Sequence, residues 1–439
     1  MEPPAKQPAS PILSSHSPPV SPQNPRRDSP FEALRYRNFR LFYYGQTLSV
    51  AGTWMQTVAQ NWLVWELTKD SRWLGIVNGA NAIPFVLFAV WGGQLADRHS
   101  RRHILLLTQF LAMILAFVLA FLAYGFWIKV EGWHIALLGV LSGIVTAFNM
   151  PAQQAFISDM IEDPRHLGNA IALSSLRFNL ARVLGPMLAG FIMAKTGVAT
   201  CFLINALSFI AVITSLLMMR TPHVPKQGKK QSIREGFRYI IENKLVLRNV
   251  LLIASGALFA WSASTLYPVF AHTFGVGATG YSWLTSAAGL GAMTSGFMLA
   301  KYGESVPRRI RIYGGAMLFA LSLILFTFTH TLAQGMILLV FVGFGMILCA
   351  NTSNVAVQSE VPAQLRGRVM AVYSLAFQGI MPVGGLLAGY MAKRFGAPQT
   401  IRINAMFFLI IVCMLLVWSY QDSNTTGTSE GNTEDALRS

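Results

Sequence analysis

Two stretches decide the fold of this chain because each repeats the other: GNAIALSSLRFNLARVLGPMLAGFIMAKTGVATCFLINA at residues 168–206 and GRVMAVYSLAFQGIMPVGGLLAGYMAKRFGAPQTIRINA at residues 367–405. They align without gaps at an offset of 199 residues. Asn205 and Asn404 occupy equivalent positions, so each copy carries an amide within an apolar segment. The unit is too long for a solenoid repeat and predicts duplication of a larger half of the chain.

The composition indicates that lipid is the main solvent of this chain. Of its 439 residues, 53% are apolar and only 12% are charged, and the mean hydropathy is +0.48. A soluble protein usually carries about a quarter charged residues. So few polar residues cannot cover a water-facing globule of this length. The sequence therefore predicts an all-α membrane protein, because a helix satisfies its own backbone groups in lipid.

Apolar runs predict twelve transmembrane helices in two pseudo-symmetric six-helix halves, since one crossing needs about 20 residues. The runs lie at 41–65, 73–96, 104–127, 134–158, 168–194, 199–219, 248–273, 280–301, 310–329, 332–358, 368–393 and 399–420. We expect an N-terminal half at 36–219, a linker at 220–247 and a C-terminal half at 248–420. Parallel halves with a site between them are typical of transporters that rock around a central pathway.

The basic residues predict the orientation of the chain. The helix assignment puts 25 of the 34 Lys and Arg residues on one side of the membrane, seven on the other and two inside it. Cytoplasmic loops carry such an excess, so we expect both termini in the cytoplasm and a multi-pass protein of the cell (inner) membrane. The same asymmetry accounts for the net charge of +16, so this charge does not indicate a protein that binds nucleic acid. Ile233, Phe237 and Ile240 recur at helical spacing in the linker and predict an amphipathic helix on the inner leaflet.

The two tails and the cysteines suggest no further site. Residues 1–30 contain nine prolines and six serines, and the chain from Gln421 onward is polar, so tails at 1–35 and 421–439 are expected to be disordered. Cys201, Cys349 and Cys413 lie far apart in apolar spans and fit small buried side chains. No P-loop, metal-ligand cluster or nucleophile–base arrangement occurs, so we expect no enzyme, no metal and no cofactor.

A charged turn joins the second and third predicted helices: Gly93-Gln-Leu-Ala-Asp97-Arg98-His-Ser100-Arg101-Arg102. It resembles the signature loop of the major facilitator superfamily, with Ser100 in place of a second glycine. Asp97 can face the positive N-terminal end of a helix in the other half, and a glycine permits close approach. We expect a conformational latch for the outward-facing state from the following residues: Gly93, Asp97, Arg98, Arg101 and Arg102. The alternative is that these charges only fix the orientation of the chain in the membrane. That would account for the arginines but not for Gly93 or Asp97.

The fifth predicted helix carries a second pattern, Ala181-Arg182-Val-Leu-Gly185-Pro186-Met-Leu-Ala189-Gly190. It resembles the antiporter motif of the same superfamily, Gly-x-x-x-Gly-Pro-x-x-Gly-Gly, with alanine at two of the small positions. Small residues four apart make a smooth seam, and proline bends a helix. The antiporter-like residues are Arg182, Gly185, Pro186, Ala189 and Gly190. Ordinary helix packing is the alternative reading, because such seams are common in membranes.

Several shorter runs resemble one branch of that superfamily. They are Gly52-Thr-Trp-Met-Gln56, Trp62-Leu-Val-Trp-Glu66, Met150-Pro-Ala152 and Arg366-Gly-Arg368-Val-Met370. The chain is similar over about residues 31 to 420 to the drug-exporter branch that includes the enterobactin exporter and macrolide efflux proteins. The resemblance implies the major facilitator fold, a cytoplasmic-membrane location and proton-coupled export.

The residues needed for proton coupling are not evident in the middle of any predicted helix. A coupling carboxylate is usually buried, so that desolvation raises its pKa toward neutrality. Asp159 and Glu360 lie at similar helix ends in the two halves and are the candidate coupling acids. The alternative is that both are solvated carboxylates at the membrane interface.

Polar residues inside the predicted helices are candidates for the transport pathway. Arg177 and Arg182 lie deep in the fifth helix and point about 140° apart. One of them could meet an anionic substrate, while a structural role for both is the alternative. The other candidate cavity residues are Gln56, Gln60, Asn81, Asn149, Gln153, Trp261, Tyr267, Asn351, Asn354 and Gln378.

These patterns lead to three hypotheses of function. The first is a monomeric secondary active transporter that exports a small amphipathic or hydrophobic molecule, such as a drug, an antibiotic or a siderophore-like compound, with protons as the coupling ion and lipid around it. The second is a lysophospholipid flippase or uniporter without proton coupling. The third is a non-transporting membrane receptor or scaffold. The deep arginines and the latch argue against the third, because a static protein has no need of them.

Overall fold

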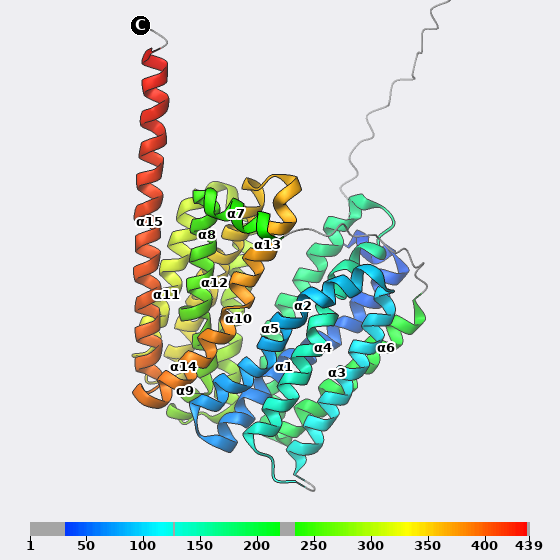
Figure 1. Ribbon diagram of the computed structural model, residues 1–439. Helices are drawn as coiled ribbons and strands as arrows, with labels where there is room; N and C mark the ends of the chain where they lie inside the picture. The colour runs from blue at the N-terminus through cyan, green and yellow to red at the C-terminus, as the bar shows by residue number, and fades with distance from the viewer. Residues whose placement is uncertain (1–30, 126–127, 220–232, 437–439) are drawn as a thin grey trace, which may run out of the picture.

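The computed structural model describes residues 31–125, 128–219 and 233–436, and these residues form helices without a β-strand. Two helical bundles stand side by side (Figure 1). The N-terminal bundle contains α1 (Arg37–Thr68), α2 (Ser71–Arg98), α3 (Arg101–Tyr124), α4 (Gly132–Asp159), α5 (Leu167–Thr196) and α6 (Val198–Met218). A short 3-10 turn, Pro164–His166, leads into α5.

The C-terminal bundle has more broken helices than the N-terminal one. Its elements are α7 (Ile233–Glu242), α8 (Lys244–Ser255), α9 (Tyr267–Thr273), α10 (Gly277–Tyr302), α11 (Gly315–Phe326), α12 (Leu332–Glu360), α13 (Ala363–Gln378), α14 (Met381–Phe395) and α15 (Ala397–Ala436). A π turn, Gly256–Ala260, and a 3-10 turn, Trp261–Leu266, link α8 to α9 in one path of 30 residues, Lys244–Thr273. Another π turn, Ile310–Gly314, precedes α11. The seventh predicted span is therefore an interrupted helix. The eleventh is interrupted as well, because α13 ends at Gln378 and α14 begins at Met381.

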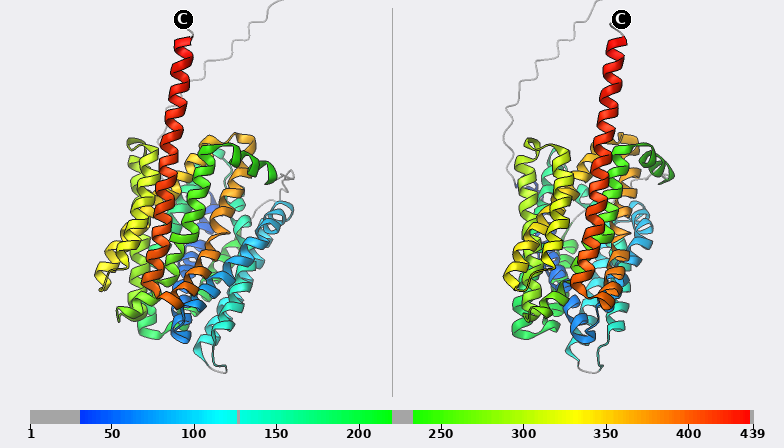
Figure 2. Two further views of the ribbon diagram at one scale, coloured as in Figure 1. Left: turned by 60° about the vertical axis from the view of Figure 1, so that its left-hand side comes forward. Right: turned by 90° about the vertical axis from the view of Figure 1, so that its left-hand side faces the viewer.

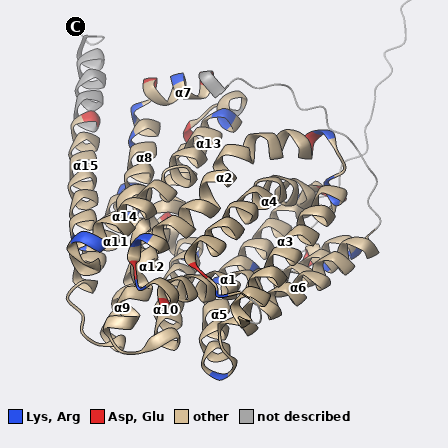
Figure 3. Ribbon diagram, turned by 60° about the horizontal axis from the view of Figure 1, so that its bottom comes forward, with Lys and Arg blue, Asp and Glu red and all other residues tan. Residues whose placement is uncertain are grey.

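The spans agree with the apolar runs of the sequence. Nine helical segments in the described part of the chain are long and apolar enough to cross a membrane, and Ile310–Phe326 is a shorter apolar helix. α1 and α10 have 32 and 26 residues and stand within the bundles, so twelve crossings remain our prediction. Lys, Arg, Asp and Glu are mostly confined to helix ends and connections (Figure 3). This pattern is that of a multi-pass membrane protein.

Glycines hold each bundle together by close helix contact. A Cβ at Gly143 of α4 would overlap the carbonyl of Asn81 on α2, and a Cβ at Gly291 of α10 would overlap the carbonyl of Val340 on α12. These two seams, α2 with α4 and α10 with α12, are equivalent in the two halves. Small residues allow such approach in membranes, where packing replaces the hydrophobic effect between helices.

Helical turns lie within both of the segments that the sequence predicted to be tails. Glu32–Arg35 forms a 3-10 turn with Ala33 buried, so the structured part begins inside the expected 1–35 tail. Residues 1–30 lie outside the described part. α15 continues to Ala436 and rises past the other helices (Figure 2). A disordered tail from residue 421 stays a prediction, since the bounds of a helix do not test it.

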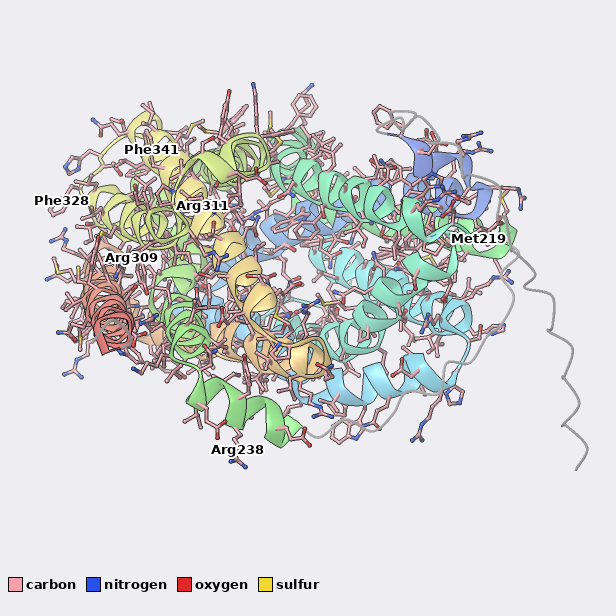
Figure 4. All side chains as sticks on the ribbon, turned by 90° about the horizontal axis from the view of Figure 1, so that it is seen from above. Met219, Arg238, Arg309, Arg311, Phe328 and Phe341 are labelled. Atoms are coloured by element: carbon pink, nitrogen blue, oxygen red, sulfur yellow. The ribbon has the colours of Figure 1, made fainter. Side chains whose placement is uncertain are left out.

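The linker helix is found where it was expected, but its contacts differ. Residues 220–232 are outside the described part, and α7 follows them. Glu235 pairs with Arg368 of α13, and the Tyr239 hydroxyl donates to the carbonyl of Glu360 at 3.4 Å. Arg238 points away from the bundle (Figure 4). The amphipathic helix therefore docks on the C-terminal half, because one side of it finds polar partners there.

Cys201 and Cys349 are buried as the sequence predicted, but Cys413 on α15 is exposed. That prediction is wrong for Cys413 because an apolar span can turn a small side chain outward as well as inward.

The molecule has two ends that differ in charge. The basic end is the upper end in Figure 1, where α7 lies and where the α2–α3 connection carries Arg98, Arg101 and Arg102. The opposite end is called the far end. The two bundles approach each other at the far end and diverge toward the basic end (Figure 1).

Candidate functional site

α2 and α14 make a close contact between the halves at the far end. The Ser71 hydroxyl donates to the carbonyl of Gly389 at 2.9 Å, and both residues are buried. A Cβ on Gly389 would lie 2.8 Å from the Ser71 carbonyl oxygen and 3.3 Å from Gly75 Cα. A Cβ on Gly75 would in turn lie 2.8 Å from the carbonyl oxygen of Gly385. Only hydrogen at these positions permits this closure.

α5 and α10 make the second contact between the halves. The Ser286 hydroxyl donates to the carbonyl of Val183 at 3.2 Å, within a buried interface. A Cβ on Gly190 would lie 2.7 Å from Ser282 Cβ. The pattern repeats that of α2 and α14, as expected for duplicated halves. Together these four helices close the far end.

Aromatic rings complete the closure from α1. The Trp62 ring stacks on Tyr281 of α10, with centroids 6.3 Å apart and planes inclined by 24°. The Trp65 ring meets His272 of α9 edge-on at 5.6 Å. Both tryptophans are at least nine-tenths buried, so the far end is sealed by apolar surface as well as by backbone contact.

A charged pair bridges the halves just outside this seal. The Lys393 Nζ atom of α14 lies 3.4 Å from a carboxylate oxygen of Asp70, which caps α2. Arg72 also pairs with Asp70, at 2.7 Å. The Arg72 guanidinium, assisted by its backbone N–H and by Lys393, lowers the pKa of Asp70 to about 2. Asp70 is therefore ionised at neutral pH and attracts Lys393 across the interface.

This pairing should not respond to pH in the ordinary assay range. A carboxylate with a lowered pKa contributes fully above its usual pKa near 4 and loses that contribution only as pH falls through about 2. We therefore expect the ratio of the transport rates of wild type and Lys393→Gln to stay constant from about pH 5 to pH 8. A ratio that grows steadily as pH falls from 8 to 5 would show that another group titrates at this contact.

The predicted latch residues lie at the basic end, and two of them bond within the N-terminal half. The Arg101 guanidinium pairs with Asp159 of α4 at 2.7 Å and donates to the carbonyl of Ala155. Arg102 donates to the carbonyl of Leu216 at 2.7 Å. These bonds tie the α2–α3 connection to α4 and α6, which fixes the turn that presents Asp97.

The other latch residues face open space in this conformation. Asp97 and Arg98 are exposed, and a Cβ on Gly93 would meet no atom within 4 Å. The neighbouring Gly92 makes the tight contact instead, against the carbonyl of Ala147. An exposed Asp97 is what a latch for the opposite conformation requires, so that role stays a prediction.

The two candidate coupling acids are both at the basic end. Asp159 is the last residue of α4, and Arg101 holds it in the ion pair just described. Glu360 is the last residue of α12, and its carboxylate accepts from the Asn243 amide at 3.4 Å. Their equivalent positions follow the duplication, and both are exposed.

The antiporter-like residues divide between two neighbours of α5. A Cβ on Gly185 would lie 2.5 Å from Trp54 Cβ, so this glycine packs against α1. Gly190 packs against α10 of the other half, as described above. Pro186 and Ala189 are buried between them, and α5 stays continuous through Pro186. This helix therefore belongs both to the N-terminal core and to the interface between the halves.

Several predicted cavity residues bond inside the N-terminal half. The Asn205 amide donates to Gln56 Oε1 at 2.6 Å, joining α6 to α1. Asn149 of α4 accepts from Thr108 of α3 at 3.0 Å and donates to Gln153 at 3.4 Å. Those bonds give Gln56, Asn149 and Gln153 a packing role in this conformation.

The remaining candidates are spread over both halves. Trp261 and Tyr267 are buried, and the Trp261 ring lies edge-on to Phe319 and Phe377 at 5.3 and 5.0 Å. Asn354 accepts from Gln358 at 2.6 Å, and Asn351 is exposed. Gln60, Asn81 and Gln378 are half-buried.

The two arginines of α5 have different surroundings. Arg177 is 5% exposed, lies over the Phe42 and Tyr43 rings of α1, and keeps Nε and Nη1 buried without a hydrogen-bond partner. Arg182 lies over the Trp54 ring at 5.9 Å and reaches Met346 Sδ of α12 at 3.9 Å. Arg182 therefore touches both halves, whereas Arg177 faces helix α1 of its own half.

Sequence reasoning missed the residues that close the far end. They are Trp62, Ser71, Gly75, Tyr281, Ser282, Gly389 and Lys393. A signal was available, since Gly75 and Gly79, like Gly385 and Gly389, are small residues four apart on one helix face. That spacing is common in this chain, so it did not single out the interface.

Two helical halves that meet at one end and diverge at the other define a membrane transporter of the alternating-access class. A family model described as transmembrane secretion effector matches residues 28–433. The chain belongs to this family of the major facilitator superfamily. It is a secondary transporter and not an enzyme.

Characterised relatives match almost their full length. The chain is 25% identical to a staphyloferrin A transporter of Staphylococcus aureus, over 87% of this chain and 95% of that protein. It is 24% identical to the multidrug efflux pump Tap of Mycolicibacterium fortuitum, over 86% and 93%. It is 22% identical to macrolide efflux protein A of Streptococcus pyogenes, over 87% and 96%.

Solved structures share the fold at lower identity. A bacterial homologue of the human lysosomal transporter Spinster, inward-facing and unoccupied, superposes with a TM-score of 0.67 at 16% identity, over 87% of this chain and 96% of that one. A POT family transporter superposes with a TM-score of 0.70 at 14% identity, over 88% and 96%. These likenesses confirm the major facilitator fold.

Proposed function

We propose that this protein exports a small amphipathic molecule, of the drug or siderophore-like kind, by alternating access driven by the proton-motive force. The relatives named above carry a siderophore, several drugs and macrolides by name, and the chain matches each over nearly its whole length. A small molecule is therefore the substrate class, and the protein works as a monomer in lipid.

The basic end faces the cytoplasm in this proposal. The α2–α3 connection carries Arg98, Arg101 and Arg102, and the end of α10 with the turn that follows it carries Lys301, Arg309 and Arg311. Lys and Arg gather in cytoplasmic loops. Both termini then lie in the cytoplasm, and the membrane is the cell (inner) membrane. The described conformation is inward-facing, because the far end is the closed one.

The observation that carries the proposal is the far-end seal, made by backbone contact between Gly75 and Gly389 and by the Trp62–Tyr281 stack. A seal without a covalent or metal link can open. Once the far end has opened, the exposed Asp97 would make the contact that holds the basic end shut. Alternating access needs these two exclusive closures.

Proton coupling is proposed through Asp159 and Glu360. Asp159 pairs with Arg101 of the latch connection, so its protonation would loosen the turn that carries Asp97. Glu360 touches Asn243 beside the linker helix α7. Both acids thus lie where the basic end would rearrange on closing.

A second candidate is a uniporter or lysophospholipid flippase without proton coupling. It is favoured by the position of the acids, since Asp159 and Glu360 are exposed at helix ends and not buried at mid-membrane depth. A membrane potential alone could then drive a charged substrate.

Transport into or out of proteoliposomes tests these candidates. We expect wild-type protein to move at least one compound of a drug and siderophore panel, and an imposed pH gradient to raise the rate. Asp159→Asn and Glu360→Gln should each reduce the response to the gradient, with Glu242→Gln on the exposed linker helix as the matched control. Equal rates with and without the gradient would favour the uniporter. Movement of no compound in the panel would contradict export and favour the scaffold.

A further inference from the structure

Arg182 places a positive charge in the middle of the membrane. It is the sixteenth of the 30 residues of α5, Leu167–Thr196, so about 22 Å of helix lie on either side of it. Its guanidinium lies over the Trp54 ring of α1 and reaches Met346 of α12. Gly289 of α10 packs against the Arg182 carbonyl, where a Cβ would lie 3.0 Å away. Elements of both halves therefore meet at this side chain.

Acidic side chains do not offset this charge in the described part of the chain. Asp and Glu lie there at or near helix ends, in connections, on α7 or on the C-terminal part of α15: Glu32, Glu66, Asp70, Asp97, Glu131, Asp159, Glu162, Asp163, Glu235, Glu242, Glu304, Glu360, Asp422, Glu430, Glu434 and Asp435. Arg182 forms no ion pair within 4 Å with any of those up to Asp422. Its neighbour Met346 offers sulfur, which is only a weak acceptor. A cation held at this depth without a counter-charge is costly, which marks it as functional.

Arg182 is less buried than the other arginine of α5. Its side chain is half-buried, whereas that of Arg177, five residues earlier, is 5% exposed under Phe42 and Tyr43. The Trp54 ring gives a flat apolar wall beside the Arg182 charge, and the thioether of Met346 gives an adaptable one. An anionic group and an adjoining apolar body would both find partners here.

We propose that Arg182 binds the anionic group of the transported molecule, so that the substrate is an amphipathic anion with a carboxylate or similar head group. This inference rests on the proposed export function and adds the charge of its substrate. The anion replaces the sulfur of Met346 as the partner of the guanidinium. Since Trp54 and Met346 belong to opposite halves, the bound anion sits on the boundary that moves.

The same charge explains export without an acid at mid-membrane depth. A membrane potential that is negative inside drives an anion outward, by about 2.3 kcal/mol for each charge and each 100 mV. Arg182 lowers the barrier for carrying that charge through the membrane centre. The electrical part of the proton-motive force then acts directly on the substrate.

A pair of matched probes tests the proposal on the full-length protein in lipid nanodiscs. Pyrenebutyrate and pyrenebutanol share one aromatic body and differ in charge, and energy transfer from tryptophan to pyrene reports their binding. A charge-assisted hydrogen bond in a buried site is worth about ten-fold or more in affinity. We expect wild-type protein to bind pyrenebutyrate about ten-fold more tightly than pyrenebutanol, and Arg182→Gln to bind both alike.

Further variants keep the result interpretable. Arg182→Lys should retain part of the preference for the anion, and Lys195→Gln, which removes the same charge from an exposed position on α5, should retain all of it. If Arg182→Gln aggregates, Arg182→Met keeps the apolar stem and serves instead. An anion preference that survives the loss of Arg182 overturns the proposal, as does its absence in wild type. Sulfate that binds as tightly as pyrenebutyrate also overturns it, since the site would then suit a simple inorganic anion.

Movement of the two probes across the membrane tests the proposed export function separately from their binding. Efflux of the neutral pyrenebutanol without any preference for the anion would leave export standing and remove the role of Arg182. Binding with the expected preference but no movement of either probe would contradict export.

Discussion

Replacing Gly389 with leucine should abolish transport while leaving the two halves folded. The hydrogen of Gly389 lies against the Ser71 carbonyl, and even a Cβ would approach that oxygen to 2.8 Å. A leucine adds three further carbons at a point where the backbones of α14 and α2 touch. Overpacking costs about 1–3 kcal/mol in ordinary cores, which shifts a two-state equilibrium by about 5- to 150-fold. The far end would stay open, and the substrate could no longer load from the basic end.

The matched control for this variant lies one turn earlier on α14. A Cβ on Gly385 would make only an ordinary contact, 3.5 Å from Thr265 Oγ1. Gly385→Ala should therefore transport at close to the wild-type rate, whereas Gly389→Ala should already be slower. The measurement is uptake into proteoliposomes of one transported compound, at equal amounts of reconstituted protein. Normal transport by Gly389→Leu would mean that the far end never needs to close.

Replacing Gly291 with leucine should have the largest effect on stability. This glycine lies in the α10–α12 seam, where a Cβ would overlap the Val340 carbonyl oxygen. The backbones of two membrane helices would have to separate along their length. We expect a loss of more than about 3 kcal/mol, which for one half of this size is a fall of roughly 6–12 °C in melting temperature. Thermal unfolding in detergent, followed by size-exclusion chromatography, gives the measurement.

Gly296 supplies the control on the same helix. A Cβ there would meet no atom within 4 Å, so Gly296→Leu should change the stability by no more than about 0.5 kcal/mol. Equal melting temperatures for Gly291→Leu and Gly296→Leu would contradict the seam as described.

The helices could be predicted from the sequence because each span is a long apolar run with a charge or glycine at its ends. The fifth span, expected at 168–194, is Leu167–Thr196 in the structure. The interruptions before Pro268 and Pro382 were not predicted, although proline is the second residue of both α9 and α14. Hydropathy reports how apolar a segment is and carries no information about which backbone hydrogen bonds are broken.

The candidate site was predictable only in part. The charged turn at Asp97 and the depth of Arg182 follow from the chain itself, because charge in a membrane protein is rare and local. The contact of Gly75 with Gly389 joins residues more than 300 positions apart, and it depends on how each helix is rotated. The sequence favoured Gln56 as a residue of the transport pathway, but in the structure its side chain accepts a hydrogen bond from the Asn205 amide. Polar residues in a membrane serve either packing or a pathway, and only their partners tell which.

Two distances measured in one sample test the rocking of the halves most directly. Spin labels at Lys195 and Thr273 would report the far end, and labels at Glu162 and Gln364 the basic end, since all four positions are exposed. Full-length protein in nanodiscs, with Cys201, Cys349 and Cys413 replaced by serine or alanine, would be compared with and without Gly389→Leu. We expect the far-end distance to lengthen in the variant and the basic-end distance to shorten. Two distances that stay unchanged, or that move in the same direction, would contradict alternating access between these halves.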